Sequence, residues 1–334
     1  MKVLVINHKE VSQLLPVNEC IEVMANALKA LSQGDAANPL RTVMWLPEKA
    51  GALGMMPAYL SDQKVMGLKA LSVFSSNMNT EYDSHQGGVF LFETKNGRPL
   101  AIVDASSITA IRTGAVSGVA TRLLARQDAG DLAMLGSGVQ AWGHLEAMLK
   151  VRKIRRVRVW SLPLDHARKF VERASRHYNI HVEFMASARE AVTGADLICT
   201  ITSAREPILT GEWIAPGTHI NAVGSSAPFT RELDTAAVVK SRLFVDRRES
   251  TINEAGDFLF PKKEGVIDDS HIQGEIGEIL TSRIEGRRSQ DEITLFKALG
   301  LAVEDVAAAH YVYTKAIEKG LGTYVELGDT RHTS

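Results

Sequence analysis

The sequence predicts an α/β protein in which a doubly wound parallel sheet forms one of two domains. Three observations support this fold class. From Asp131 onward, short apolar segments of strand length alternate with amphipathic helical segments, a pattern typical of parallel sheets covered by helices. A glycine-rich turn, Gly136 to Ala141, joins the first of these strands to the first helix. The length of 334 residues, 45% of them hydrophobic, suits about two domain cores of ordinary size.

The composition excludes several classes of protein. Because 38 Lys and Arg face 39 Asp and Glu, the net charge of −1 offers no general attraction for nucleic acid or an anionic membrane. Cys20 and Cys199 make neither a disulfide framework nor a zinc site, and the ten histidines lack paired metal-binding spacing. No apolar run reaches the roughly 18 residues of a spanning helix, and no signal peptide is recognisable. We expect a cytoplasmic protein without metal, nucleic acid or membrane partners.

The first third of the chain predicts a mixed α+β region. A helix is expected at residues 16–33, where apolar residues recur at helical spacing before Gly34. Two short strands around an Asn96-Gly97 turn follow. The small and apolar residues of 108–124 then predict a buried helix that leads into the next region.

The remainder of the chain predicts the doubly wound sheet. Strands are expected at residues 131–136, 155–160, 181–185, 197–202, 219–224 and 243–246. Helices are expected at 139–150, 165–178 and 187–193, the last with a capping box formed by Ser187 and Glu190. A final helix at 303–319 ends at Gly320 and is expected to pack on the first region.

The strand ending at Leu135 runs directly into Gly136-Ser-Gly-Val-Gln-Ala141, which opens a helix. This G-x-G-x-x-A pattern is the dinucleotide-binding signature of a Rossmann unit. Gly136 allows the tight turn, Gly138 allows a pyrophosphate to approach the backbone, and Ala141 allows close packing of helix on strand. The helix N-terminus adds N–H donors and a positive dipole for the phosphates.

The end of the second strand of such a unit faces the adenosine ribose, where an acidic residue selects NAD. The sequence there is Trp160-Ser161-Leu162-Pro163, which has no carboxylate to repel the extra phosphate of NADP. Ser161 is able to hydrogen-bond that phosphate, so we expect NADP to be preferred over NAD. Arg158 and Arg168 are nearby candidates for the same phosphate, although a solvated charge is the simpler interpretation of each.

Beyond this turn, the sequence resembles the ornithine cyclodeaminase/mu-crystallin family over nearly its whole length. The segments that carry the resemblance are 56–59, Lys69, 84–86, 108–115, 136–141, 219–224, 231–234 and 300–305. It is most similar to the mu-crystallin branch through segments 84–86, 206–213 and 253–257. That branch includes ketimine reductases, which reduce cyclic imino acids with NAD(P)H.

The resemblance implies a Rossmann dinucleotide-binding domain inserted into a mixed α+β substrate-binding and dimerisation domain. The inserted domain would span residues 123–302, and the other domain residues 1–122 plus 303–334. A homodimer is implied as well. The implied cofactor contacts are Thr113, Gly136, Ser137, Gly138, Val139, Gln140, Ser161, Thr200, Ile201, Thr202, Val223 and Gly224.

The resemblance also implies a small amino or imino acid substrate. Arg41, Lys69 and Arg112 match the family's substrate-site cations, and Met56 edges the substrate pocket. Arg112 interrupts an apolar run, so its guanidinium needs an anionic partner, which is either a substrate carboxylate or a buried internal carboxylate. Lys69 lies in an alternating strand-like segment; it either points inward or is a solvent-facing lysine on an edge strand.

We expect catalysis to depend on Lys69 as proton donor or electrostatic anchor and on Arg112 as carboxylate anchor. His85 is a second candidate acid, because the ordinary pKa of histidine lies near neutrality, although it is equally consistent with a structural loop residue. Water is a third possible proton source.

A departure from the family bears on the reaction. Ornithine cyclodeaminases and the related archaeal alanine dehydrogenase carry an aspartate where this chain has Ser226, whose hydroxyl has no acid/base capacity near neutrality. We therefore expect an NAD(P)H-dependent ketimine reductase with Ser226 in its substrate site. The alternatives are an amino-acid dehydrogenase of the alanine dehydrogenase type, then an ornithine cyclodeaminase, or a non-catalytic binding protein similar to mu-crystallin.

Overall fold

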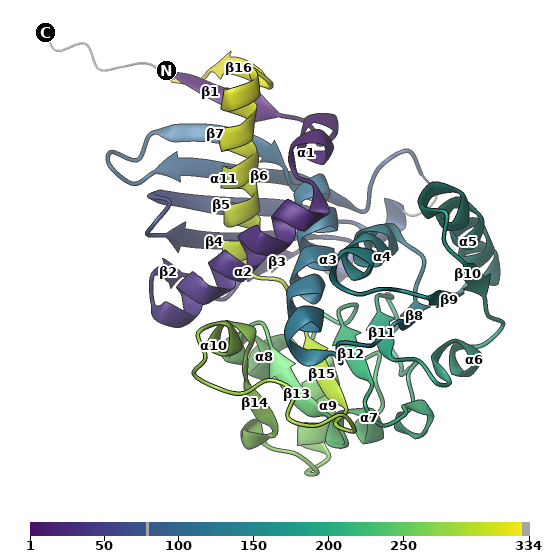
Figure 1. Cartoon of the computed structure of the whole chain (residues 1–334). Helices are drawn as coiled ribbons and strands as arrows, with labels where there is room; N and C mark the ends of the chain where they lie inside the picture. Colours follow the sequence, from purple (N-terminus) through teal and green to yellow (C-terminus); the bar gives the residue numbers. More distant parts are fainter. Residues whose placement is uncertain (78–79, 329–334) are drawn as a thin grey trace, which may run out of the picture. The chain divides into compact units, whose positions relative to one another are not determined.

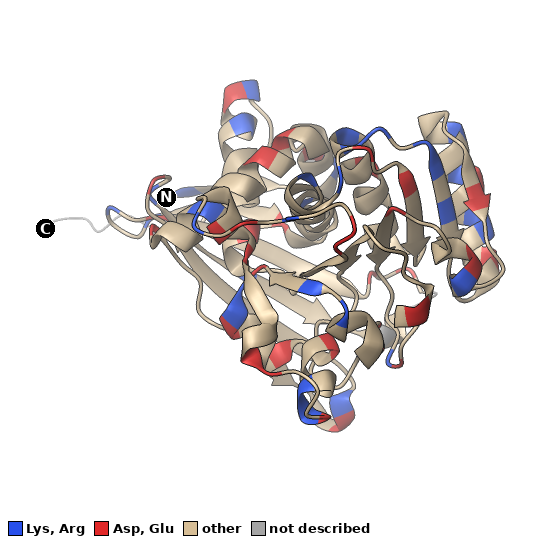
Figure 2. Ribbon diagram, turned by 60° about the horizontal axis from the view of Figure 1, so that its bottom comes forward, with Lys and Arg blue, Asp and Glu red and all other residues tan. Residues whose placement is uncertain are grey.

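The computed structural model describes residues 1–77 and 80–328 of the chain, so residues 329–334 of the predicted first domain lie outside the described residues. The chain divides into two compact units (Figure 1). The first unit consists of Met1–Arg112 together with the residues from Leu301 on, and the second consists of Thr113–Gly300. In the sequence, the second unit is therefore an insertion in the first. Acidic and basic residues are interspersed along the ribbon of both units (Figure 2).

The first unit contains an eight-stranded mixed sheet with strand order β16-β1-β7-β6-β5-β4-β2 and with β3 paired to β4. Its strands are β1 (Lys2–Ile6), β2 (Ala36–Ala37), β3 (Thr42–Trp45), β4 (Ala52–Leu60), β5 (Val65–Val73), β6 (His85–Glu93), β7 (Pro99–Asp104) and β16 (Thr323–Glu326). Its helices are α1 (His8–Leu14), α2 (Val17–Gln33), α11 (Ala302–Lys319), the start of α3 (Ala105–Leu124) and the short 3₁₀ turns η1 (Pro47–Lys49) and η2 (Ser75–Asn77).

Helix α11 crosses one face of this sheet, against β4, β5 and β6, and α2 packs beside it (Figure 1). The alternation of β5 explains the contact, because Val65, Gly67, Lys69 and Leu71 are buried while the residues between them are more exposed. A Cβ atom on Gly67 would lie 2.8 Å from Cγ2 of Val306, so the glycine lets α11 approach the sheet closely. The face that carries Lys69 is therefore the covered face.

The second unit contains an eight-stranded sheet in which all pairs are parallel, with strand order β10-β9-β8-β11-β12-β15-β13-β14. Its strands are β8 (Asp131–Leu135), β9 (Arg156–Trp160), β10 (Val182–Phe184), β11 (Leu197–Thr200), β12 (His219–Ala222), β13 (Arg242–Val245), β14 (Ile272–Glu275) and β15 (Thr294–Lys297). Its helices are the rest of α3, α4 (Val139–Val151), α5 (Leu164–Tyr178), α6 (Ala188–Val192), α7 (Thr235–Val239), α8 (Arg248–Glu254), α9 (Gly256–Lys263), α10 (Ile276–Leu280) and the 3₁₀ turns η3 (Gly211–Trp213) and η4 (Asp269–His271).

The first six strands of this order, numbered by sequence, follow the 3-2-1-4-5-6 arrangement of a Rossmann sheet. The predicted fold class is confirmed. All six predicted strands are present within a few residues, but β14 and β15 were not predicted. Each has only four residues; β14 is mostly polar, and β15 does not stand out from the mostly apolar stretch 293–301 in which it lies.

The predicted capping box of α6 is only half correct. The Ser187 hydroxyl accepts the N–H of Glu190 at 3.2 Å, as expected. The Glu190 carboxylate accepts the N–H of Ala186 at 3.1 Å instead of that of Ser187. The Glu190 side chain therefore binds the residue before the N-cap, Ala186, and connects the segment preceding α6 to its first turn.

Candidate functional site

Four charged side chains form a buried cluster in the first unit. The Lys69 Nζ atom lies 3.1 and 3.2 Å from the two carboxylate oxygens of Asp305. The Arg112 Nε atom donates to Asp305 Oδ1 at 2.9 Å, and its Nη1 atom donates to Glu304 Oε2 at 2.8 Å. Lys69 is 2% exposed, Arg112 5%, and both carboxylates are fully buried. The sequence placed both cations in the substrate site and did not identify their carboxylate partners.

The fold brings these side chains together from distant parts of the chain. Lys69 lies on β5, opposite Met56 of β4 and Val89 of β6, on the face covered by α11. Glu304 and Asp305 lie in the first turn of α11, where negative charge also complements the helix dipole. The N–H of Leu301, before that turn, donates to Glu304 Oε2 at 3.2 Å. The carboxylates are therefore fixed by both the helix end and the cations.

Burial changes the acid strength of Lys69. Desolvation lowers the pKa of its ammonium from 10.5 to about 8, partly opposed by the negative charge of Asp305. The nearby positive charges of Arg112 and Arg41 also lower this pKa. An ammonium with a pKa of about 8 can exchange its proton near neutral pH, as an acid catalyst requires. The interpretation of Lys69 as an exposed edge lysine is wrong, because β5 is an interior strand and the side chain is buried.

Three further predicted substrate residues lie in the first unit. Arg41 immediately precedes β3, is partly buried, and acts electrostatically on Lys69. Met56 is 8% exposed and lies beside Lys69 in the sheet. His85 is exposed at the start of β6, where its Nδ1 atom lies 2.9 Å from the Ser84 hydroxyl. Desolvation and then the charge of Lys69 lower the pKa of His85, so its ring is mostly neutral at pH 7 and is a poor proton donor.

The predicted cofactor residues of the second unit follow neighbouring strands. Gly136 to Gln140 follow β8, Ser161 follows β9, Ile201 and Thr202 follow β11, and Val223 and Gly224 follow β12. Thr200 is the last residue of β11. Because parallel strands end at the same sheet edge, these residues share the carboxyl edge of the sheet. The order of the strands reverses between β8 and β11, and Rossmann sheets bind their ligands outside that point.

The glycine-rich turn has the geometry that the sequence predicted. Gly136 has a φ of +124°, and a Cβ atom there would lie 2.6 Å from the carbonyl oxygen of Ile201. Gly138 begins α4, and a Cβ there would meet no atom within 4 Å, so the surface beside it is open. Ala141 is fully buried and Val139 is 68% exposed. The turn therefore fits a bound pyrophosphate, with free N–H groups of the α4 N-terminus as donors.

The predicted ribose position is occupied by two serines. The Ser137 hydroxyl donates to the Ser161 hydroxyl at 2.8 Å, which connects the glycine-rich turn to the end of β9. Arg158 is 3% exposed and pairs with Asp131 at 2.7 Å, so it is neither a solvated charge nor a phosphate ligand. Its Nη1 atom also donates to the carbonyls of Glu190 and Thr193. Arg168 lies over the ring of Phe184 at 3.9 Å.

Thr113 and Ser226, the remaining predicted residues, also belong to the second unit. Thr113 lies in α3 and is 7% exposed. The next residue, Gly114, packs against α4, because a Cβ there would lie 2.4 Å from the backbone of Gly143. Ser226 is exposed in the loop after β12. The structure thus places Ser226 in a different unit from the other predicted substrate residues.

Sequence reasoning missed three acidic residues. Glu304 and Asp305 were noticed only as part of segment 300–305, and Glu232, which bonds Thr202 and Gly224, only as part of segment 231–234. The available signal was their position: Glu304 and Asp305 interrupt an apolar helix, and Glu232 precedes a buried leucine. An acidic residue in such a setting needs a buried partner.

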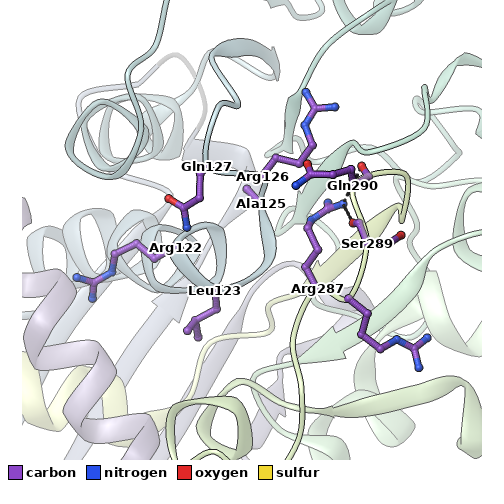
Figure 3. A pocket seen from close by; sticks show the side chains of 9 residues that line it. Arg122, Leu123, Ala125, Arg126, Gln127, Arg287, Ser289 and Gln290 are labelled. Carbon is purple, nitrogen blue, oxygen red and sulfur yellow. Dashed lines mark hydrogen bonds between the residues drawn. The ribbon is translucent and has the colours of Figure 1, made fainter.

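A pocket of about 330 Å³ in the second unit contains none of the predicted residues (Figure 3). It is lined by residues 122, 123 and 125–127, at and after the end of α3, and by residues 287–290, before β15. The Arg287 Nε atom donates to the Leu124 carbonyl at 2.6 Å, and Arg152 donates to the carbonyls of Thr121 and Ala125. These guanidinium groups therefore satisfy the last carbonyls of α3.

No helix within residues 1–77 and 80–328 is both long and apolar enough to cross a membrane. Over the same described ranges, no group of three or more His, Cys, Asp or Glu is arranged to hold a metal ion.

The family model of the ornithine cyclodeaminase/mu-crystallin family matches residues 1–320. The chain belongs to this family. Ketimine reductase mu-crystallin of Mus musculus is 40% identical over 302 residues, which cover 90% of this chain and 91% of the relative. The resemblance inferred from the motifs is thereby confirmed.

Two solved structures of the family are similar over nearly the entire chain. The Δ¹-pyrroline-2-carboxylate reductase of Thermococcus litoralis, in complex with NADH and L-proline, has a TM-score of 0.94 and 41% identity, covering 96% of this chain and 99% of that chain. An archaeal alanine dehydrogenase dimer with bound NAD has a TM-score of 0.93 and 31% identity, covering 98% of this chain and all of that chain. Both structures contain a nicotinamide dinucleotide.

Proposed function

We propose that the protein is an NAD(P)H-dependent ketimine reductase that converts a small cyclic imino acid into the corresponding amino acid. The observation that carries this proposal is the buried Lys69, whose lowered pKa and fixed bond to Asp305 suit it to deliver a proton. A bound NAD(P)H supplies the hydride for the imine carbon. Lys69 supplies the proton for the imine nitrogen, so the C=N bond gains two hydrogens and the amino acid results.

The cations of the first unit suit a substrate that carries a carboxylate. Lys69 and Arg112 pair with the buried Asp305 and Glu304, and the charge of Arg41 acts on Lys69. We propose that Arg41 and Arg112 bind the substrate carboxylate, with Met56 and His85 beside the ring, and that Ser226 contributes a hydroxyl.

The proposed cofactor contacts are the twelve predicted residues of the second unit, from Thr113 to Gly224. The open surface at Gly138, the N-terminus of α4 and the switch point between β8 and β11 support this assignment. The ornithine cyclodeaminase reaction is disfavoured, because it needs a base where this chain has Ser226. The alanine dehydrogenase neighbour keeps an amino-acid dehydrogenase as the second candidate.

The decisive experiment incubates the protein with NADPH or NADH and follows the absorbance of the reduced cofactor. The panel contains Δ¹-pyrroline-2-carboxylate, its six-membered homologue, a dicarboxylate imine, and pyruvate with ammonia. We expect oxidation of the cofactor with at least one of the imines. Turnover of pyruvate and ammonia alone would favour the dehydrogenase, and turnover of none would leave the non-catalytic binding protein.

We further propose that NADPH is preferred over NADH, because residues 161–163, directly after β9, contain no carboxylate. The Ser161→Asp variant tests this proposal. Aspartate would repel the phosphate of NADPH and accept a hydrogen bond from the ribose of NADH, so we expect the ratio of kcat/KM for NADPH to that for NADH to fall at least about tenfold. Steady-state kinetics with both cofactors give this ratio. An unchanged ratio would show that Ser161 does not contact the phosphate.

The uncovered face of the sheet in the first unit supports a homodimer. Residues that alternate with the buried ones point away from α11, and several are large and apolar: Met55, Tyr59, Met66, Leu68 and Phe90. Tyr59 and Met66 are 38% and 39% exposed. We propose that a second copy covers this face, and sedimentation would then give twice the chain mass.

We propose that the enzyme is cytoplasmic, where the buried Cys20 and Cys199 remain thiols.

A further inference from the structure

Glu232 makes an unusual number of hydrogen bonds at the carboxyl edge of the parallel sheet. Its side chain is fully buried, between the ends of β11 and β12. The Oε1 atom accepts the N–H of Thr202 at 2.6 Å and its hydroxyl at 2.7 Å. The Oε2 atom accepts the Thr200 hydroxyl and the N–H of Gly224, both at 2.8 Å. One carboxylate therefore binds the segments that follow β11, which borders the switch point, and β12, its neighbour.

We propose that Glu232 is a positioning residue for the dinucleotide: its carboxylate fixes the loops after β11 and β12 in the conformation that receives the cofactor. This inference rests on the proposed function, which assigns Thr200, Thr202 and Gly224 to the cofactor site. Because Glu232 itself is fully buried, it would act on the dinucleotide only through these residues.

A carboxyl group satisfies this arrangement, and an amide does not. Each oxygen faces one backbone N–H, from Thr202 on one side and Gly224 on the other, together with one hydroxyl. A glutamine amide would turn its NH₂ group toward one of these backbone donors in either orientation, because backbone N–H groups cannot become acceptors. The geometry therefore distinguishes glutamate from its nearest isostere.

A second layer holds Glu232 from behind. The Asp257 Oδ1 atom accepts the backbone N–H groups of Glu232 at 2.8 Å and of Leu233 at 3.0 Å. Lys297, at the end of β15, pairs with the other oxygen of Asp257 at 3.0 Å, and both side chains are buried. The backbone of Glu232 is thus fixed relative to the sheet, and this fixes the position of the Glu232 carboxylate. Burial and the charge of Asp257 raise the pKa of Glu232, which is the cost of keeping an acid in this position.

Gly224 shows how closely the loops approach. A Cβ atom at this position would lie 2.1 Å from the Thr202 carbonyl oxygen and 2.4 Å from Glu232 Oε1. The absent side chain therefore leaves the space in which the carboxylate joins the two loops.

The Glu232→Gln variant tests the proposal, with Asp234→Ala as the matched control. Asp234 lies on the same segment, and its Oδ1 atom accepts the N–H groups of Gly211, at the start of η3, and of Ala237 in α7, but none from Thr200, Thr202 or Gly224. NADPH binding is measured by quenching of protein fluorescence, thermal unfolding by circular dichroism, and the KM for Δ¹-pyrroline-2-carboxylate at saturating NADPH.

We expect Glu232→Gln to raise the Kd for NADPH by about tenfold or more, since a buried donor loses its acceptor, and to leave the KM for the imine within about twofold. Asp234→Ala should lower the unfolding midpoint without changing the Kd for NADPH. Unchanged NADPH binding by Glu232→Gln, or equal weakening by Asp234→Ala, would overturn the inference. Failure of the wild-type protein to bind NADPH or NADH would instead overturn the proposed function.

Discussion

Replacing Lys69 with methionine is expected to reduce kcat for imine reduction by about 10²- to 10⁴-fold, the usual contribution of a positioned acid. Methionine fills similar space, and Asp305 keeps its bond from Arg112 at 2.9 Å, so the variant should fold. The Kd for NADPH should not change, because the proposed cofactor residues lie in the second unit. Stopped-flow measurement of hydride transfer under single-turnover conditions checks the effect on chemistry alone.

The pH dependence identifies the proton donor. Because Lys69 has a pKa of about 8, the wild-type reduction rate should fall as the pH rises through 8, when the ammonium loses its proton. The reverse oxidation should rise through the same pH. The Lys69→Met variant should lose this inflection, whereas His85→Asn should retain it. A wild-type inflection that persists in Lys69→Met would assign the proton to another donor.

Replacing Arg112 with alanine is expected to lower the free energy of unfolding by about 3–5 kcal/mol, the usual cost of leaving buried charge without its partner. Arg112 bonds two fully buried carboxylates, Glu304 and Asp305, so its loss affects both. Urea denaturation followed by fluorescence measures the change.

Two further variants separate folding from substrate binding. Arg112→Ala combined with Glu304→Gln removes one of the unpaired charges and should recover part of the lost stability. Arg112→Lys keeps one positive charge without the planar fork, so it should fold better than Arg112→Ala and raise the KM for the imine. A KM equal to that of the wild type would make the role of Arg112 structural only.

The sequence was sufficient to predict the Rossmann-type unit because its signals are local. The turn at Gly136 depends on a φ that favours glycine, and the strand and helix beside it follow within a few residues. The partners of Lys69 and Arg112 were not predictable in this way. Asp305 is 236 residues from Lys69, and Glu304 is 192 residues from Arg112, so no spacing rule connects them.

Arg158 illustrates a related difficulty. The sequence favours a solvated charge for Arg158 in the second strand of the Rossmann unit, and only the sheet reveals that Asp131 and two carbonyls surround it. The strand β15 was missed for a different reason, because the four residues Thr294–Lys297 are too few to show a period within the mostly apolar stretch 293–301. Arg158 and β15 both depend on neighbours that are remote in sequence.

The separation between the cations of the first unit and their carboxylates also sets an order of events during synthesis. The ribosome completes β5 and its Lys69 long before it makes Asp305, and at about 5–20 residues per second the interval lasts roughly 10–50 seconds. Throughout that interval Lys69 cannot be buried with Asp305, its partner in the folded unit. The first unit is therefore the first to be synthesised in part and the last to be completed. Its sheet is covered on the Lys69 face only after α11 has emerged.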